Sequence, residues 1–117
     1  MRHIEEDTQI ACVTWFSYQY PQYIPLLHHS PNGGYRNSRE AGRFKAMGTR
    51  AGFPDLVLLI ARGGYHGLFV ELKSKDGEQT RLQKAYQEAV EEQGYKYVIC
   101  RNAEEFIYNI SEYMGEA

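Results

Sequence analysis

The stretch that most constrains the fold of this chain is GFPDLVLLIARGGYHGLFVELKSK, residues 52–75. Residues 55–61 form a run that is apolar after its first position, and such a run is typical of a central strand buried on both faces. An Arg-Gly-Gly turn at 62–64 follows, and residues 67–73 return as a second strand. The sequence therefore predicts a hairpin at the centre of a sheet.

Patterns typical of helices and strands surround this hairpin. In chain order we expect a helix at 5–20, a short strand at 24–28, a helix at 37–47, the two hairpin strands, a helix at 80–93, a strand at 95–100 and a helix at 102–113. The order α-β-α-β-β-α-β-α contains no repeat and no linker. We therefore predict one α/β domain, residues 1–117, with a mixed central sheet flanked by helices.

Three of these helices begin with the spacing of a capping box. In such a pair, two side chains satisfy N–H groups that the first helical turn leaves without a partner. The pairs are Asn37 with Glu40, Thr80 with Gln83, and Asn102 with Glu105.

Several classes of protein are excluded by composition. The first nine residues are polar and acidic, which is unlike a signal peptide, and no apolar run approaches the length of a membrane span. Cys12 and Cys100 lie inside predicted elements without the spacing of a metal site, so we expect buried, reduced thiols. These features predict a cytoplasmic protein.

The charges are unevenly distributed, although the net charge is only −2. Between residues 36 and 50 the only acid is Glu40, and the bases are Arg36, Arg39, Arg43, Lys45 and Arg50. A basic segment on an otherwise acidic chain indicates a confined site for an anion. A solvated helix face rich in Arg explains the same charges equally well.

Charged residues also mark one end of the predicted hairpin. Glu71 and Lys73 are two residues apart, so their side chains point to the same face of the strand, roughly 6–7 Å apart. Pro54 lacks an N–H group and therefore belongs at the start of a strand, which fixes where Asp55 emerges. Pairing of the two strands is expected to bring Asp55 beside Glu71 and Lys73.

Two carboxylates at such a position repel each other unless one takes a proton or a cation lies between them. Mg²⁺ prefers carboxylate oxygens, backbone carbonyls and waters, and the Leu72 carbonyl is a candidate third ligand. Lys73 can orient or help to deprotonate an attacking water and can contact a phosphate oxygen. Asp55, Glu71 and Lys73 together suit metal-assisted hydrolysis of a phosphodiester. Alternatively, Asp55 is a turn acid and Glu71 with Lys73 is an exposed pair.

The combination of GFPD, a hairpin and ELK resembles the PD-(D/E)xK nuclease superfamily, and in particular its VRR-NUC branch, the virus-type replication-repair nucleases. The resemblance extends from residue 5 to about residue 101. It includes Glu5 and Gln9 of the first helix, the SPNGG loop, the AGRFKAMGTRAG segment and the helix that opens with Gln83.

This resemblance implies a restriction-endonuclease-like fold and dependence on Mg²⁺ or Mn²⁺. It implies an active site of Asp55, Glu71 and Lys73, supported by a Glu on a helix and by a Gln. Small members of the family look like homodimers that cut branched DNA, notably four-way junctions, and leave a 5′-phosphate and a 3′-hydroxyl. It also implies a bacterial or phage-infected host cell.

The supporting residues have alternatives. Glu5 is our candidate for the helix-borne catalytic acid, but Glu6 could fill that role, and either could simply stabilise the helix dipole. Gln83 could act in the site or only cap its helix. His28 and His29 are candidates for a phosphate contact, although apolar residues commonly precede PNGG in the family.

Residues for binding DNA are predicted in the loop and the basic segment. Their contacts to phosphates would hold DNA without reading its sequence. Asn32 and Gly33 are either a cradle for a substrate strand or part of a plain turn. The candidates are Asn32, Gly33, Arg36, Arg39, Arg43, Lys45 and Arg50. A two-fold dimer would double these contacts. Competing functions are a nuclease for linear or flap DNA and a module that binds DNA without cutting it.

Overall fold

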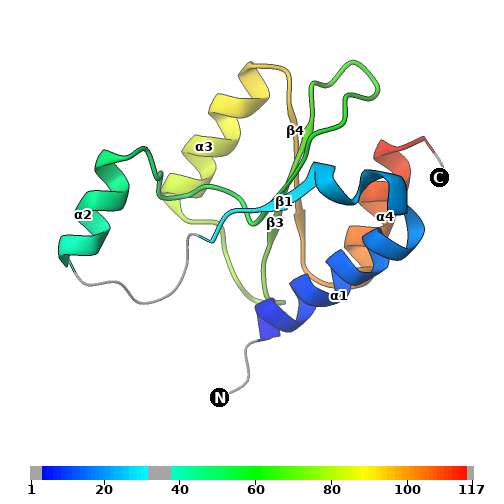
Figure 1. The fold of residues 1–117 in the computed structure, drawn as a ribbon, viewed down its shortest axis with the longest axis horizontal. Helices are drawn as coiled ribbons and strands as arrows, with labels where there is room; N and C mark the ends of the chain where they lie inside the picture. Colours follow the sequence, from blue (N-terminus) through cyan, green and yellow to red (C-terminus); the bar gives the residue numbers. More distant parts are fainter. Residues whose placement is uncertain (1–3, 32–37, 116–117) are drawn as a thin grey trace.

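A computed structural model describes residues 4–31 and 38–115 of the chain (Figure 1). Helices and strands alternate along the chain much as the sequence predicts. The elements are α1 (Ile4–Gln19), the 3₁₀ helix η1 (Pro21–Leu26), β1 (Leu27–His29), α2 (Ser38–Ala46), β2 (Leu56–Leu58), β3 (Leu68–Leu72), α3 (Arg81–Glu92), β4 (Lys96–Cys100) and α4 (Ala103–Tyr113).

The four strands form one mixed sheet in the order β1-β2-β3-β4. β1 pairs antiparallel with β2, β2 pairs antiparallel with β3, and β3 pairs parallel with β4. The turn after β2 depends on Gly63 and Gly64, whose φ angles are 57° and 88°. Residues with a side chain rarely adopt such positive φ angles. The predicted α/β fold, with its mixed sheet flanked by helices, is confirmed.

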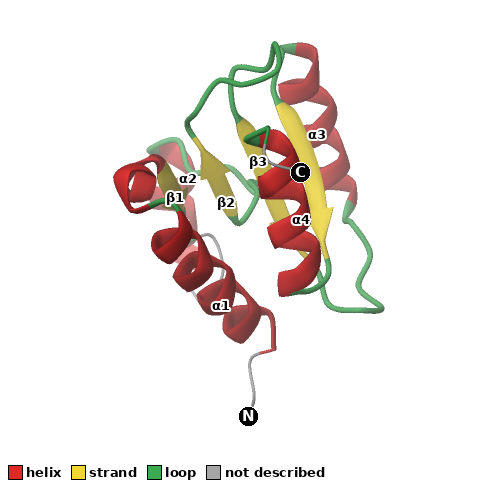
Figure 2. Ribbon diagram, turned by 90° about the vertical axis from the view of Figure 1, so that its right-hand side faces the viewer, coloured by secondary structure: helices red, strands yellow, loops and turns green. Residues whose placement is uncertain are grey.

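Alternation along β3 divides the interior into two apolar clusters. Leu68, Val70 and Leu72 point to one face, where α1 and α4 pack, as Figure 2 shows. Phe69 points to the other face, where side chains of α3 cover it. Because Glu71 shares the face of Phe69, an acid lies at the end of the second apolar cluster.

The helix starts agree closely with the capping pattern. Thr80 Oγ1 accepts from Gln83 N, and Gln83 Oε1 accepts from Thr80 N, which completes the predicted box of α3. At α4, Asn102 accepts from Glu105 N, but the Glu105 carboxylate accepts from Arg101 N instead of Asn102 N. The pair of Asn37 with Glu40 lies partly outside the described residues.

Two predicted strands differ from the structure. Residues 24–28 were expected to be a strand, but a 3₁₀ helix occupies Pro21–Leu26 and only Leu27–His29 pairs with the sheet. Prolines at 21 and 25 explain the difference, because their fixed φ suits a tight helical turn and they lack N–H groups for a ladder. The strand expected at 55–61 is shorter, since β2 ends at Leu58 and Leu59 is 56% exposed.

Both cysteines are buried, free thiols, as the sequence predicts. Burial raises the pKa of Cys12 to about 11. Burial is also the largest cause that raises the pKa of Cys100 to about 12. Within the described part of the chain, no helix has the length and apolar character needed to cross a membrane.

Candidate active site

Asp55 lies immediately before β2, at the point where Pro54 is fully buried. Since Leu56 pairs with Val70, the next position along the hairpin sets Asp55 beside Glu71. The Leu72 amide donates to Asp55 Oδ2 over 2.7 Å. The Asp55 backbone carbonyl also lies 2.7 Å from His29 Nδ1. These contacts fix the carboxylate at the end of the sheet where β2 begins and β3 ends.

The pKa of Asp55 is raised above its usual value. Burial is the largest cause, and the negative charges of Glu5 and Glu71 add to it. The hydrogen bond from Leu72 and the charge of His29 act in the opposite direction. A positive charge nearby would therefore stabilise the ionised carboxylate of Asp55.

Glu71 is fully buried at the end of β3, and its two oxygens have different surroundings. Oε1 accepts from Gln79 Nε2 over 3.1 Å and also from the hydroxyl of Tyr97. Oε2 accepts no hydrogen bond, and its charged neighbour is Lys73 Nζ at 3.7 Å. One carboxylate oxygen is thus fully satisfied and the other is left for a further partner.

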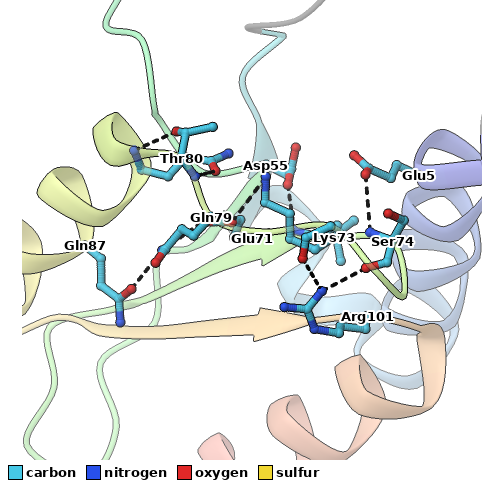
Figure 3. Close-up of polar contacts among 12 residues, drawn as sticks. Glu5, Asp55, Glu71, Lys73, Ser74, Gln79, Thr80, Gln87 and Arg101 are labelled. Carbon is cyan, nitrogen blue, oxygen red and sulfur yellow. Dashed lines mark hydrogen bonds and ion pairs between the residues drawn. The ribbon is translucent and has the colours of Figure 1, made fainter.

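The side chains around Asp55 and Glu71 come from distant parts of the chain, as Figure 3 shows. Glu5 reaches the site from α1, and its Oε2 accepts from Ser74 N over 3.3 Å. Lys73 follows β3 directly, with a side chain that is 14% exposed. The structure therefore brings together Glu5, Asp55, Glu71 and Lys73, as the sequence predicts for neighbours in one site.

The donor set suits a hard cation that keeps part of its water shell. In the ranges 4–31 and 38–115, no group of three or more His, Cys, Asp or Glu side chains could hold a metal ion alone. Two carboxylates, a buried Glu71 Oε2 without a hydrogen bond and a raised Asp55 pKa nevertheless fit Mg²⁺ or Mn²⁺, because Mg²⁺ usually binds one or two carboxylates and retains waters. The Leu72 carbonyl remains a predicted third ligand.

Gln83 is engaged in the cap of α3, where its Oε1 accepts from Thr80 N over 2.8 Å. The glutamine that contacts Glu71 is Gln79, which precedes the cap. A catalytic role for Gln83 stays a prediction, and the observed contact favours the capping alternative.

Sequence reasoning missed three residues that contact or support the site. Tyr97 and Gln79 bind Glu71 directly. Arg101 Nη1 donates to the Ser74 carbonyl over 2.8 Å and to the Gly77 carbonyl over 2.6 Å, which ties down the loop between β3 and α3. The alternation of side chains along β4 is the only sequence pattern that could have placed Tyr97 on the same face as Glu71. No local sequence pattern indicates the contacts of Gln79 and Arg101.

The described part of the basic segment, residues 38–50, lies apart from these carboxylates. Figure 1 shows α2 away from the sheet, and Arg39, Arg43 and Lys45 are exposed on it. Arg50 Nη1 folds back to the Lys45 and Thr49 carbonyls, at 3.1 and 3.3 Å. The predicted DNA-binding residues Asn32, Gly33 and Arg36 lie outside the described residues.

Comparison with known proteins shows the family to which this fold belongs. The family model of the VRR-NUC domain matches residues 4–104. A solved structure described as a VRR_NUC domain protein is 32% identical, with a TM-score of 0.85, and the match covers 100% of this chain and 93% of the other. No curated protein matches the chain. On its fold, its hairpin acids and these matches, the chain belongs to the VRR-NUC family of nuclease domains.

Proposed function

We propose that this chain is a Mg²⁺- or Mn²⁺-dependent endonuclease that hydrolyses phosphodiesters in branched DNA such as four-way junctions. The observation that carries the proposal is the Glu71 carboxylate, fully buried, with one oxygen bonded twice and the other without a hydrogen bond. A buried ionised group needs an opposite charge, and Lys73 at 3.7 Å supplies only part of it. A divalent cation between Asp55 and Glu71 would supply the rest.

The residues have separate roles in the proposed reaction. Asp55 and Glu71 would hold the cation, with the Leu72 carbonyl as a third ligand. The cation, when bound, supplies Lewis acidity and stabilises negative charge on the phosphate. Lys73 orients the attacking water, and Glu5 accepts a hydrogen bond from a water in the same site. In-line attack by the water forms a new bond from its oxygen to phosphorus and breaks the bond between phosphorus and O3′. The water loses a proton and O3′ takes one up from solvent, leaving a 5′-phosphate and a 3′-hydroxyl.

DNA is held through its phosphate backbone by residues of the SPNGG loop and the basic segment. The predicted contacts to the phosphate backbone are Asn32, Gly33, Arg36, Arg39, Arg43, Lys45 and Arg50. A monomer has few such contacts, so we propose a homodimer, whose two-fold axis would match a symmetric junction. We further propose that residues 1–117 act as one domain in the cytoplasm of a bacterial or phage-infected cell.

Cleavage of labelled linear, flap and four-way DNA by the purified protein with Mn²⁺ tests the proposal. Symmetric cuts near the branch, with linear duplex left largely intact, are expected. Equal cutting of linear duplex would assign the chain to the general nucleases. Binding without cutting, unchanged in Asp55→Asn, would assign it to the DNA-binding modules.

The site residues are tested with the same substrates. Glu71→Gln and Lys73→Ala should reduce cleavage by at least about a hundredfold while leaving the circular dichroism spectrum unchanged. Glu88→Gln and Lys84→Ala are matched controls, because both residues are exposed on α3. Retained cleavage by Glu71→Gln or Lys73→Ala would contradict the assignment.

A further inference from the structure

The two donors to Glu71 both bind the same oxygen. Tyr97 and Gln79 come from different elements, yet each donates to Oε1 and neither donates to Oε2. A buried carboxylate that needed only to be satisfied would gain more from one donor on each oxygen. The asymmetry therefore fixes the rotation of the carboxylate and leaves Oε2 directed toward Lys73 and the proposed cation.

The position of the Tyr97 hydroxyl is set by the parallel pairing of β3 with β4. Tyr97 is paired with Phe69, two residues before Glu71, and its ring stacks on the Phe69 ring with centroids 6.5 Å apart. The Tyr97 side chain is only 6% exposed, so the ring has little freedom. Stacked in this way, the ring directs its hydroxyl along the strand to the Glu71 carboxylate.

The Gln79 amide is oriented by carboxylates at both ends of a hydrogen-bond chain. Gln79 Nε2 donates to Glu71 Oε1 and, over 2.8 Å, to Gln87 Oε1. Gln87 Nε2 in turn donates to Glu91 Oε2 over 3.2 Å. Since an ionised carboxylate only accepts, the amide of Gln87 must present its oxygen to Gln79, and Gln79 must present its nitrogen to Glu71.

We infer that Tyr97 and Gln79 are positioning residues that lock the Glu71 carboxylate in one rotamer and so present Oε2 to the divalent cation. The inference rests on the proposed function. Both residues act through Glu71, to which they donate hydrogen bonds. Residues that hold a metal ligand in this way typically contribute 10- to 100-fold in metal affinity, because the free ligand must otherwise be ordered when the ion binds.

Binding of Mn²⁺ alone, measured from the electron paramagnetic resonance signal of the free ion, tests the inference without turnover. Tyr97→Phe and Gln79→Leu should each weaken Mn²⁺ binding about tenfold or more. Tyr113→Phe is the matched control, because it removes another buried tyrosine hydroxyl, one that donates to the Ile60 carbonyl over 2.6 Å. The control should change Mn²⁺ binding less than twofold.

A second background separates positioning from a general loss of structure. In Glu71→Gln, the ligand is gone, so adding Tyr97→Phe should weaken Mn²⁺ binding no further. If Tyr97→Phe does not fold, Gln79→Leu carries the same test, since Gln79 is only half-buried in the loop before α3.

Three results would have different meanings. Strong loss in Glu71→Gln with little loss in Tyr97→Phe and Gln79→Leu would overturn the inference and leave the proposed function standing. No loss in Glu71→Gln would overturn the cation site itself, and with it both proposals. Equal losses in Tyr97→Phe with and without Glu71→Gln would also overturn the inference, because the hydroxyl would then act independently of Glu71.

Discussion

Arg101 is the residue on which the loop after β3 depends. Its guanidinium donates to the carbonyls of Ser74 and Gly77, while Ser74 N donates to Glu5. The same loop ends near Gln79, which binds Glu71. The Arg101 side chain therefore fixes a loop whose residues contact two acids of the site, Glu5 and Glu71. No motif in the sequence indicates this role of Arg101.

Arg101→Lys should loosen this loop, because the planar guanidinium holds Nη1 in place between the two carbonyls, whereas a lysine ammonium lies at the end of a flexible stem and is more strongly hydrated. We expect a loss of about 1–2 kcal/mol in the free energy of unfolding and a clear loss of DNA cleavage. Urea denaturation and cleavage of four-way DNA measure the two effects. Arg62→Lys is the control, since the Arg62 guanidinium donates to the adjacent Ala61 carbonyl in the hairpin turn, away from the site. Equal behaviour of the two variants would contradict this role.

The site was partly predictable at this scale, for reasons that individual residues make clear. Asp55 and Glu71 could be placed together because a proline marks a strand start and period-two alternation is local. Tyr97 could not, because its place beside Glu71 depends on the register of a parallel pair joined through α3. Gln79 and Arg101 could not either, since their contacts depend on the course of an irregular loop.

The buried thiols make stability depend on pH. Each has a pKa in the folded chain above the ordinary 9.0, at about 11 for Cys12 and about 12 for Cys100. Their contribution is therefore complete below pH 9 and is lost as pH rises toward the folded pKa, because only the unfolded chain releases the protons. The slope is at most about 1.4 kcal/mol per pH unit for each thiol.

Denaturation at pH 8 and pH 10.5 measures this effect. The free energy of unfolding should fall less over that interval in Cys12→Ala and Cys100→Ala than in the unaltered chain. The tyrosines are the same in all three proteins, so their titration cancels in the comparison. Parallel losses in the three proteins would contradict a contribution from the thiols.

At the scale of elements, the junction between the GFPD segment and α3 holds the first acid in place. Gly52 has a φ of 84°, and a Cβ added there would lie 2.8 Å from the carbonyl carbon and oxygen of Leu82. Leu82 belongs to the first turn of α3, beside the Thr80 cap. The glycine therefore allows the backbone before Asp55 to pack directly on the start of the helix.

Gly52→Ala should cost about 2–4 kcal/mol in the free energy of unfolding, from the strained φ and the contact with backbone together. Gly64→Ala separates the two causes, because Gly64 has a similar φ of 88° and nothing within 4 Å of an added Cβ. That control should cost about 1 kcal/mol. Thermal and urea denaturation give both values, and equal costs would mean that the close approach to Leu82 is unimportant.

The elements themselves were largely predictable because their signals are local. The capping box of Thr80 with Gln83 and the Gly-Gly turn each depend on neighbours within a few residues. The strand predicted at 24–28 overlaps β1 only at residues 27 and 28, because two prolines favour a 3₁₀ turn before it. The strand predicted at 55–61 was too long. Only three residues of β1 pair with β2, and the apolar composition of residues 55–61 does not reveal the length of this pairing.

For the whole molecule, the sheet separates two apolar clusters and leaves the acids at the edge of the smaller one. The larger cluster lies between the sheet and the helices α1 and α4. The smaller one contains Val57, Phe69 and Tyr97, with α3 packed against it. The acids come together only in the folded chain, so binding of the proposed cation would be linked to folding.

Mn²⁺ should therefore stabilise the folded chain. A ligand that binds only the folded state at a hundred times its Kd adds about 2.7 kcal/mol, which for a chain of this size raises the melting temperature by about 10 °C. Differential scanning fluorimetry across a Mn²⁺ series measures the shift. The Glu71→Gln variant should show little shift, whereas an equal shift in both proteins would locate the bound ion elsewhere.

The amide of Leu72 ends the β3 ladder by donating to a carboxylate, Asp55 Oδ2, at 2.7 Å. Its proton consequently senses the electronic state of that acid more directly than any other backbone group we describe. In a nitrogen–proton correlation spectrum, the Leu72 amide resonance should shift when Asp55 is protonated or binds a cation. It should not shift when DNA binds to the basic segment without a cation.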